Sequence, residues 1–440
     1  MLASALAWIK RMQAWRTMDR ILVANTLWML LGEGTKLMMQ MAYFVIIARM
    51  LGADGYGLFI GVVALIAVLT PFSSLGRGEL LVMHVSRDRQ CFPEYFGNSL
   101  VMTALSGTIL TGIALGMGVM LFSGTISPLL IVCIALSDLI GYRLLEISGK
   151  AYQAFEQLQR TAQLNVLIGA TRLLAAVLLV FVVTDQGVES WALLYLLSTV
   201  VAASISLGLV TKELGRPAIK LRKLVTELRA GSAFSISQSS LALYSDVGKT
   251  VLLRYSTAEH AGIYAAASRI VDVALTPVYA LMDAAFPRFF QEGVHGLGKS
   301  VSYASRLLLL SLVYCGLAWL GLWLAAPLIP WVLGDEYRSA VEAIQWMAII
   351  PLLKGMHVFA ADALTGAGFQ GWRTGVQVLV AVVVTGLHIL IVPLYAWGGA
   401  IAVSIVGDVM LCGLYWAMIG YLLKRERSGQ QKGHLTNEGG

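Results

Sequence analysis

The sequence predicts an all-α integral membrane protein with twelve transmembrane helices in two similar halves. The chain has 440 residues, of which 58% are hydrophobic and only 13% charged, and its mean hydropathy is +0.76. Soluble domains are nearer about 25% charged. No polar block longer than about 30 residues separates the apolar stretches, so a soluble catalytic or nucleotide-binding domain has no room. The composition therefore indicates a polytopic membrane protein.

Apolar stretches of about 20 residues, enough to cross a bilayer, recur along the chain. The short turns after the odd-numbered spans are acidic, whereas Lys and Arg concentrate in the loops after the even-numbered ones. The positive-inside rule then places both termini in the cytoplasm and accounts for the net charge of +7 without nucleic acid. The expected spans lie near residues 21–49, 57–82, 95–122, 127–150, 161–184, 189–210, 232–254, 260–287, 303–328, 338–363, 374–393 and 397–423.

The longest basic loop falls at the midpoint of the chain and divides it into two halves of six spans. This loop has apolar residues at helical spacing among Lys and Arg, which favours a short amphipathic helix on the inner leaflet. The expected organisation is a cytoplasmic interfacial segment (1–20), an N-terminal six-helix lobe (21–210), a basic linker (211–231), a C-terminal six-helix lobe (232–423) and a disordered cytoplasmic tail (424–440).

Two sequence echoes indicate that the halves are repeats. After the first and seventh spans, Gly57-Leu58-Phe59 aligns with Gly262-Ile263-Tyr264, each following a short acidic turn. Later in each half, Gln159-Arg160-Thr161 aligns with Trp372-Arg373-Thr374. Both echoes occupy the same place in their half, so they predict a parallel repeat about an axis along the membrane normal.

Charged residues inside the spans are the candidate functional residues, because a charge at bilayer depth costs about 2.5–3.5 kcal/mol on insertion scales. Several are three residues apart and share a helix face: Glu33 with Lys36, and Asp246 with Lys249. Such pairs are either structural or line a polar cavity. Arg172 has no acid nearby in sequence, so its partner lies on another helix or on the cargo. Asp408 is isolated, which predicts protonation, a pair across helices, or ion coupling.

We therefore assign two sets of candidate residues. A guanidinium binds phosphate through paired hydrogen bonds, whereas an ammonium acts as a point charge. No cysteine or histidine spacing indicates a metal site, and no cofactor is expected apart from a coupled H⁺ or Na⁺. The cargo-binding set is Arg269, Lys249, Arg254, Lys36, Arg77 and Arg172, and the ion-coupling set is Asp246, Asp272, Asp408 and Glu33.

Four segments in the expected order resemble a known family. They are ARMLGADGYGLF, AEHAGIYAAASRI, LGDEYRSAVEAIQWMAIIPLL and PLYAWGGAIAVSIVGDV. These resemble the matching turns of bacterial lipid-linked oligosaccharide flippases, the polysaccharide-exporter branch of the multidrug/oligosaccharidyl-lipid/polysaccharide superfamily. The resemblance covers residues 20–425.

The resemblance implies two pseudo-symmetric six-helix lobes around a central cavity that opens alternately to each side. It implies undecaprenyl-diphosphate-linked oligosaccharide as cargo, moved from the inner to the outer leaflet of the bacterial inner membrane for surface polysaccharide synthesis. It also implies cavity cations on the eighth span, where Arg269 stands. A polysaccharide polymerase and glycosyltransferases are the expected partners besides the cargo and the membrane.

Two alternatives stay open at the level of sequence. A drug or metabolite cation antiporter of the same superfamily shares the fold, but it favours an acidic cavity. A membrane polymerase or ligase acting on the lipid-linked sugar is expected to carry a large outer loop, and the longest outer loop here has about ten residues.

Overall fold

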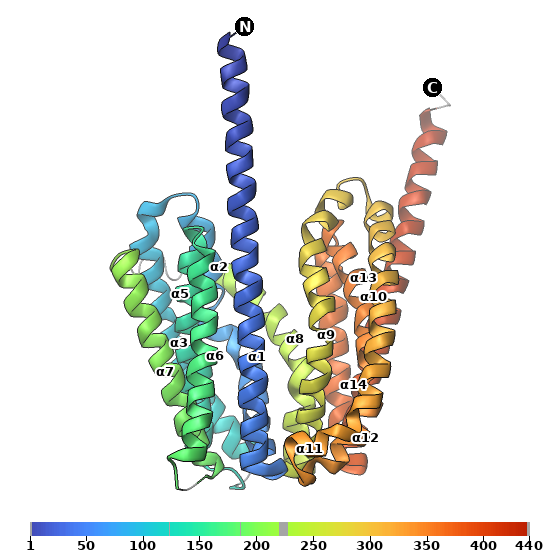
Figure 1. Cartoon of the computed structure of the whole chain (residues 1–440). Helices are drawn as coiled ribbons and strands as arrows, with labels where there is room; N and C mark the ends of the chain where they lie inside the picture. Colours follow the sequence, from blue (N-terminus) through green and yellow to red (C-terminus); the bar gives the residue numbers. More distant parts are fainter. Residues whose placement is uncertain (1, 123, 185, 220–227, 438–440) are drawn as a thin grey trace. The chain divides into compact units, whose positions relative to one another are not determined.

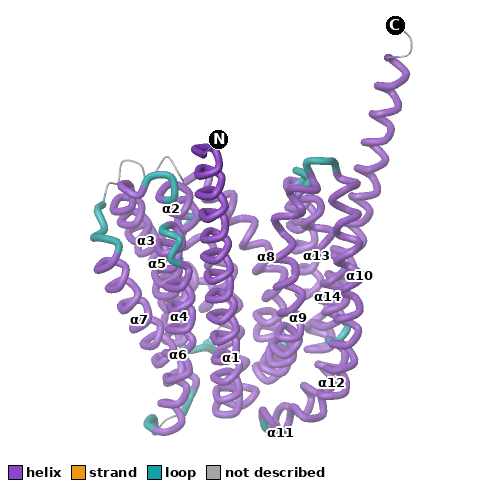
Figure 2. The backbone as a smooth tube through the Cα atoms, turned by 45° about the horizontal axis from the view of Figure 1, so that its top comes forward, coloured by secondary structure: helices purple, strands orange, loops and turns teal. Residues whose placement is uncertain are grey.

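The computed structural model describes residues 2–122, 124–184, 186–219 and 228–437. Every regular element in this part of the chain is a helix, as Figures 1 and 2 show. Helices are the expected solution for an apolar chain, because lipid offers no partner for backbone N–H and C=O groups, and a helix satisfies them internally. The prediction of an all-α membrane protein is therefore confirmed.

The structure gives the number of membrane spans less directly than it gives the fold class. In the described residues, eight helices are long and apolar enough to cross a membrane, or nine if the bent pair Asp335–Met347 and Ile350–Gly366 forms one span. Two of the eight, Leu31–Val85 and Gln370–Glu426, have 55 and 57 residues. Each contains a break in its helical backbone, at Gly52 and at Ala396, so each comprises two helices joined at a sharp bend and has enough residues for two spans. A count of twelve stays a prediction.

The chain divides into two compact units. Unit 1 comprises Met1–Met50 and Leu69–Ile236, and unit 2 comprises Leu51–Val68 and Ser237–Gly440. The units differ from the expected lobes in two segments. Leu51–Val68 belongs to unit 2 by its contacts although it precedes the midpoint of the sequence, and residues 232–236, expected in the C-terminal lobe, belong to unit 1.

In unit 1, long antiparallel helices surround an apolar core. Phe92 and Phe96 are stacked with ring centroids 5.1 Å apart, and they pack with the buried Tyr152. Gly32 allows α1 to approach α6 closely, since a Cβ at Gly32 would lie 2.7 Å from Cβ of Ala162. The helices with residues in unit 1 are α1 (Leu2–Ser74), α2 (Arg77–Val85), α3 (Phe92–Phe122), α4 (Pro128–Ala135), the π-helix η2 (Leu136–Gly141), α5 (Tyr142–Ala154), α6 (Leu158–Phe181), α7 (Val188–Glu213) and the start of α8, with the short 3-10 helix η1 (Arg89–Cys91) before α3.

In unit 2, α13 packs against α9, α10 and α14, so it lies inside this bundle (Figure 1). Its core combines small residues of α13, such as Ala360 and Ala363, with larger side chains of the neighbouring helices. The elements of unit 2 are the middle of α1, most of α8 (Leu228–Tyr255), α9 (Ala258–Gly293), α10 (Leu297–Ala325), η4 (Ala326–Leu328), α11 (Ile329–Leu333), η5 (Asp335–Tyr337), α12 (Arg338–Met347), α13 (Ile350–Gly366) and α14 (Gln370–Asn437).

Two of the segments that carry the family resemblance meet at the break in α1. Gly52 has φ 67°, a left-handed conformation that glycine adopts without strain. The carboxylate of Glu336 accepts a hydrogen bond from the backbone N–H of Ala53 at 3.0 Å, and the hydroxyl of Tyr337 donates to the carbonyl of Gly52 at 3.1 Å. The turn LGADG is therefore held by the turn LGDEY, far away in sequence.

The two turns of the second sequence echo have the same backbone motif, and this motif matches them in a register that differs by one residue from the alignment by sequence. In unit 1 the N–H of Gln157 bonds the carbonyl of Tyr152 at 2.9 Å, and in unit 2 the N–H of Phe369 bonds that of Leu364 at 2.8 Å. Each is the long hydrogen bond of a Schellman motif, in which the preceding residue has positive φ. Superposing the two turns matches Arg160 with Trp372, not with Arg373.

The ends and the linker differ from, or lie beyond, what the sequence leads us to expect. Helix α14 continues to Asn437, so the expected disordered tail over 424–440 is largely helical where it is described. The expected amphipathic linker helix falls on residues 220–227, which lie outside the described residues. The side chains of the N-terminal segment 1–20 are not among those described, although its backbone is helical from Leu2.

Candidate functional site

The candidate residues fall in both units, and several of them form ion pairs within their own unit. In unit 1, the ammonium of Lys36 lies 3.2 Å from Oε2 of Glu33, as their helical spacing predicts. The amide of Asn165 on α6 donates to Oε1 of Glu33 at 2.6 Å. The carboxylate therefore joins two helices and neutralises the lysine at the same time.

Arg172 pairs with a residue on another helix, one of the two possibilities that the sequence left open. Its guanidinium lies 3.4 Å from Oδ1 of Asp138, and it covers the ring of Tyr195 with its Cζ 4.3 Å from the centroid. The hydroxyl of Tyr195 also donates to Asp138, at 2.9 Å. Asp138 belongs to the π-helix η2, an element that is rare and frequent at functional sites. The sequence did not point to Tyr195, because nothing local marks it.

Arg77 occupies the break between α1 and α2. Leu75 and Gly76 both have positive φ, and Arg77 is the first residue of α2. The Gly-Arg-Gly segment therefore begins at a kink in the backbone. The side chain of Arg77 is buried, so in unit 1 it is part of the packed protein.

In unit 2, two lysines from different helices are held by two carboxylates. Lys249 on α8 lies 2.5 Å from Oδ1 of Asp246, and Lys354 on α13 lies 3.7 Å from Oδ1 of Asp272 on α9. Lys249 also interacts electrostatically with Asp272, so the two pairs form one cluster. Lys354 is absent from the cargo-binding set predicted from the sequence, because its partner lies on a helix far away in sequence.

Asp408 pairs across helices, one of the three possibilities that its isolation left open. Its Oδ1 accepts a hydrogen bond from the hydroxyl of Tyr244 on α8 and lies 3.1 Å from Nε2 of His357 on α13. The side chain of Asp408 is only 2% exposed. Lys354 interacts electrostatically with Asp408, which connects this triad to the lysine–aspartate cluster. Tyr244 and His357 were not in the predicted site.

The two remaining candidates in unit 2 are placed differently. Arg269 is half-buried on α9, one helical turn before Asp272. Arg254 is exposed in the last turn of α8, with its Cζ 5.4 Å from the ring centroid of Tyr255. A cation in that position interacts favourably with the helix C-terminus. The structure therefore brings Lys249, Asp246 and Asp272 together and leaves Arg254 at the helix end.

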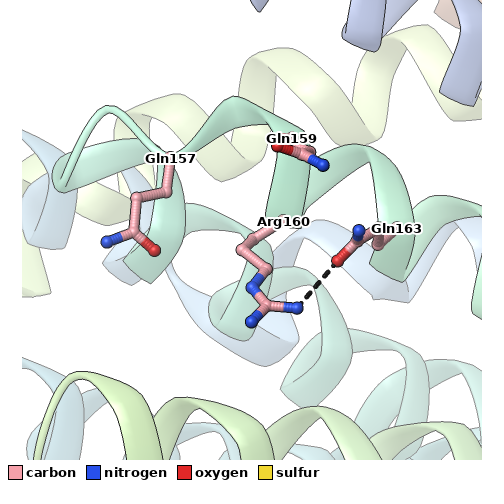
Figure 3. A pocket seen from close by; sticks show the side chains of 4 residues that line it. All are labelled: Gln157, Gln159, Arg160 and Gln163. Carbon is pink, nitrogen blue, oxygen red and sulfur yellow. Dashed lines mark hydrogen bonds between the residues drawn. The ribbon is translucent and has the colours of Figure 1, made fainter.

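A separate polar cavity of about 440 Å³ lies at the turn between α5 and α6 in unit 1. Figure 3 shows Gln157, Gln159, Arg160 and Gln163 around it. One guanidinium nitrogen of Arg160 donates to Gln163 at 3.0 Å and another to Glu213 at 2.6 Å, so this cation is already neutralised. The cavity has no buried charge to attract a phosphate.

No metal site is found in the part of the chain that the structure describes, where no three His, Cys, Asp or Glu side chains group suitably. The chemistry available to the candidate residues is that of paired charged side chains. A lysine or arginine held by a carboxylate can exchange that partner for an anionic ligand, and a buried carboxylate beside an imidazole can hold a proton.

A family model described as "Polysaccharide biosynthesis protein" matches residues 22–292. No curated protein matches the sequence.

Solved structures match almost the whole chain at low identity. An inward-facing multidrug resistance MATE family transporter of the MOP superfamily has 15% identity and a TM-score of 0.73, and the match covers 88% of this chain and 96% of that one. An outward-facing multidrug resistance MATE family transporter of the same superfamily has 16% identity and a TM-score of 0.59, with 92% and 96% covered. A MOP superfamily transporter from Pyrococcus furiosus, described as having a binding pocket of reverse polarity, has 16% identity and a TM-score of 0.60, with 91% and 96% covered. The chain therefore has the MATE fold.

Proposed function

Because the family model matches more than half of the chain, this protein belongs to the polysaccharide biosynthesis protein family, and we propose that it flips a lipid-linked oligosaccharide across a bacterial inner membrane. In this proposal the cargo is linked to undecaprenyl diphosphate and moves from the inner to the outer leaflet by alternating access. Glycosyltransferases then supply the cargo and a polysaccharide polymerase consumes it.

The observation that carries the proposal is the cluster of exchangeable cations within the spans of unit 2. Lys249 and Lys354 come from two helices, and their side chains are 15% and 19% exposed. Asp272, which holds Lys354, is 52% exposed, and the pair is 3.7 Å apart. A carboxylate so placed is a weak competitor for the lysine when a diphosphate arrives, because the diphosphate brings more charge. Modest binding suits a carrier, since the cargo must also leave.

The cation antiporter is the alternative that shares this fold. Such a site needs carboxylates that are not already neutralised by the protein. Here the carboxylates Glu33, Asp246 and Asp272 each hold a lysine. The charge pattern therefore favours an anionic cargo over a cationic drug.

The orientation is also part of the proposal. Both termini lie in the cytoplasm, because Lys and Arg concentrate in the loops on that side. Fusions of a cytoplasm-active reporter and a periplasm-active reporter to the C-terminus test this directly. Activity of the periplasmic reporter alone would reverse the assignment.

Complementation tests the function itself. The gene is expressed in a bacterial strain that lacks its own flippase and makes a compatible lipid-linked oligosaccharide, and surface polysaccharide is measured. We expect polysaccharide to be restored by the wild type and lost with Arg269→Ala or Lys249→Gln, while both variants remain in the membrane. Arg338→Gln is the matched control, because Arg338 pairs with Asp335 at an exposed position. Normal polysaccharide in the Arg269→Ala and Lys249→Gln strains would contradict the proposed cargo site.

A further inference from the structure

The triad of Asp408, His357 and Tyr244 ties three helices of unit 2 together through one buried oxygen. Oδ1 of Asp408 on α14 receives the hydroxyl of Tyr244 from α8 and lies 3.1 Å from Nε2 of His357 on α13. The side chains of Asp408 and His357 are 2% and 11% exposed. Loss of either contact leaves a buried carboxylate incompletely paired, which is costly at low dielectric.

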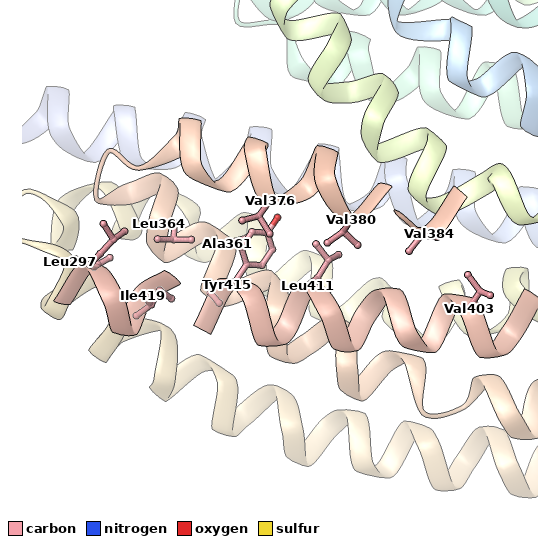
Figure 4. Packing of buried hydrophobic residues seen from close by; sticks show 12 residues of the cluster. Leu297, Ala361, Leu364, Val376, Val380, Val384, Val403, Leu411, Tyr415 and Ile419 are labelled. Carbon is pink, nitrogen blue, oxygen red and sulfur yellow. The ribbon is translucent and has the colours of Figure 1, made fainter. Parts of the chain in front are cut away.

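The helices approach closely at this point because of a glycine. A Cβ at Gly407, next to Asp408, would lie 3.0 Å from the ring of Tyr244. About two turns further along α14, Trp416 donates to the carbonyl of Met356, beside His357, at 3.1 Å. The apolar cluster of α13 and α14 includes Leu411 and Tyr415, which follow Asp408 on α14 and are labelled in Figure 4. Water has little access to this carboxylate.

Charged and titratable groups reach the triad from every packed helix. Lys354 on α13 and Tyr279 on α9 interact electrostatically with Asp408. Beyond them lie Asp272 and Arg269 on α9, and Asp246, Lys249 and Tyr264 on α8 and α9. Cys412 on α14 is one turn from Asp408. The ring centroid of Tyr415 on α14 lies 6.4 Å from that of His357, and within this set His357 is the one imidazole.

The chemistry of the triad depends on one proton. With a neutral imidazole, Nε2–H donates to Asp408, and the pair carries one negative charge. With an imidazolium, both hydrogen bonds to Asp408 remain and the pair becomes neutral. Taking a net charge out of water is far more costly than burying a neutral pair. The packed arrangement of α8, α13 and α14 is therefore favoured when the second proton is present.

From this geometry we propose that His357 and Asp408 form a proton-binding site. A proton bound there stabilises the packing of α8 against α13 and α14. Release of the proton removes the positive charge of the imidazolium and leaves the pair with one net negative charge, which favours entry of water and loosening of the Tyr244 contact. This inference rests on the proposed function, in which the site couples proton movement to the cargo cycle. It names the proton as the coupled ion, because an imidazole nitrogen contacts Asp408 and the Lys354 ammonium acts on it electrostatically, whereas Na⁺ would need more oxygen ligands than the one hydroxyl of Tyr244.

The first test counts protons in the purified full-length protein in lipid vesicles, without cargo. Uptake is measured with an indicator dye between about pH 8 and pH 5, the range in which histidine titrates. We expect His357→Gln and Asp408→Asn each to take up about one proton fewer than the wild type, and the double variant to lose the same single proton. Unchanged uptake in Asp408→Asn, or a loss of two protons in the double variant, would overturn the shared site.

The second test asks whether the bound proton stabilises the packing of α8. Hydrogen exchange of the α8 peptides around Tyr244 is followed by mass spectrometry at several pH values, after correction for the intrinsic pH dependence. In the wild type, protection falls as pH rises. Tyr244→Phe keeps the wild-type proton uptake but removes this pH dependence, and His295→Gln, at an exposed histidine of the same unit, retains it. Protection that is independent of pH in the wild type would refute the coupling. Neither measurement uses cargo. A negative result in either test therefore contradicts the proton site, whereas failed complementation contradicts the proposed function.

Discussion

Gly57 and Gly262 make reciprocal contacts at the starts of two helices in unit 2. A Cβ at Gly57 would lie 1.8 Å from the carbonyl oxygen of Ala258, and a Cβ at Gly262 would lie 2.0 Å from that of Ala53. Ala53 stands in relation to Gly57 as Ala258 does to Gly262, so equivalent positions of the two repeats meet. The first sequence echo therefore marks a contact around a local pseudo-two-fold axis.

We predict that Gly57→Ala and Gly262→Ala each destabilise the protein. The added methyl group meets a backbone carbonyl, which moves only with its helix, so overpacking costs about 1–3 kcal/mol or more. Thermal unfolding of the purified protein measures the loss. Gly386→Ala on α14 is the control, because a Cβ there meets no atom within 4 Å. It is expected to be neutral or to stabilise by about 0.5–1 kcal/mol through lower backbone entropy in the unfolded chain. Equal melting temperatures for all three variants would contradict the close-contact argument.

The two glycines that flank Glu33 are expected to behave differently. Gly32→Ala places a methyl group 2.7 Å from Cβ of Ala162, whereas a Cβ at Gly34 meets nothing within 4 Å. Gly32→Ala pushes α6 away from α1 and strains the hydrogen bond between Asn165 and Glu33. We expect a loss of about 1–3 kcal/mol for Gly32→Ala and none for Gly34→Ala. Melting curves of the two variants decide the matter, and a larger loss in Gly34→Ala would show that the α1–α6 contact is wrong.

Two arginine–aspartate pairs of unit 2 offer a matched comparison of buried and exposed charge. Arg373 lies 3.5 Å from Asp362, whose side chain is 2% exposed, and it also donates to Thr365 at 2.8 Å. Arg338 lies 3.0 Å from Asp335, and both side chains are largely exposed. Arg373→Gln leaves a buried carboxylate without its cation, which costs about 3–5 kcal/mol. Arg338→Gln changes stability by about 0–1 kcal/mol.

Chemical or thermal unfolding of Arg373→Gln and Arg338→Gln measures this contrast. A second variant, Asp362→Asn combined with Arg373→Gln, removes both charges and is expected to recover part of the loss. Similar melting temperatures for Arg373→Gln and Arg338→Gln would refute the argument from burial.

Contacts within one helix were predictable, and contacts between helices were not. The pairs Glu33–Lys36 and Asp246–Lys249 follow from helical spacing alone, because residues three apart share a face. The partner of Arg172 is 34 residues away, and those of Asp408 are 51 and 164 residues away. Helical periodicity gives no information about residues so far apart in sequence. Only the structure therefore identified four further site residues: Lys354, Tyr195, His357 and Tyr244.

The register of the second repeat shows the same limit at a turn. The sequence aligns Arg160 with Arg373 because the residue types are alike. The hydrogen bonds of the two turns match Gln157 with Phe369 instead, since a Schellman motif is defined by backbone geometry and accepts Glu156 in one half and Gly368 in the other.

The sequence by itself determined that this chain is a membrane protein with helical spans. It also determined that the two halves are similar and that charged residues lie within the apolar spans. These properties depend on composition and on spacing along one helix, which lipid and backbone geometry convert directly into structure. Only the tertiary structure decided which charges neutralise each other across helices, and that the carboxylate of Asp408 contacts an imidazole and a phenol. The reason is that packing brings together residues whose separation along the chain carries no signal.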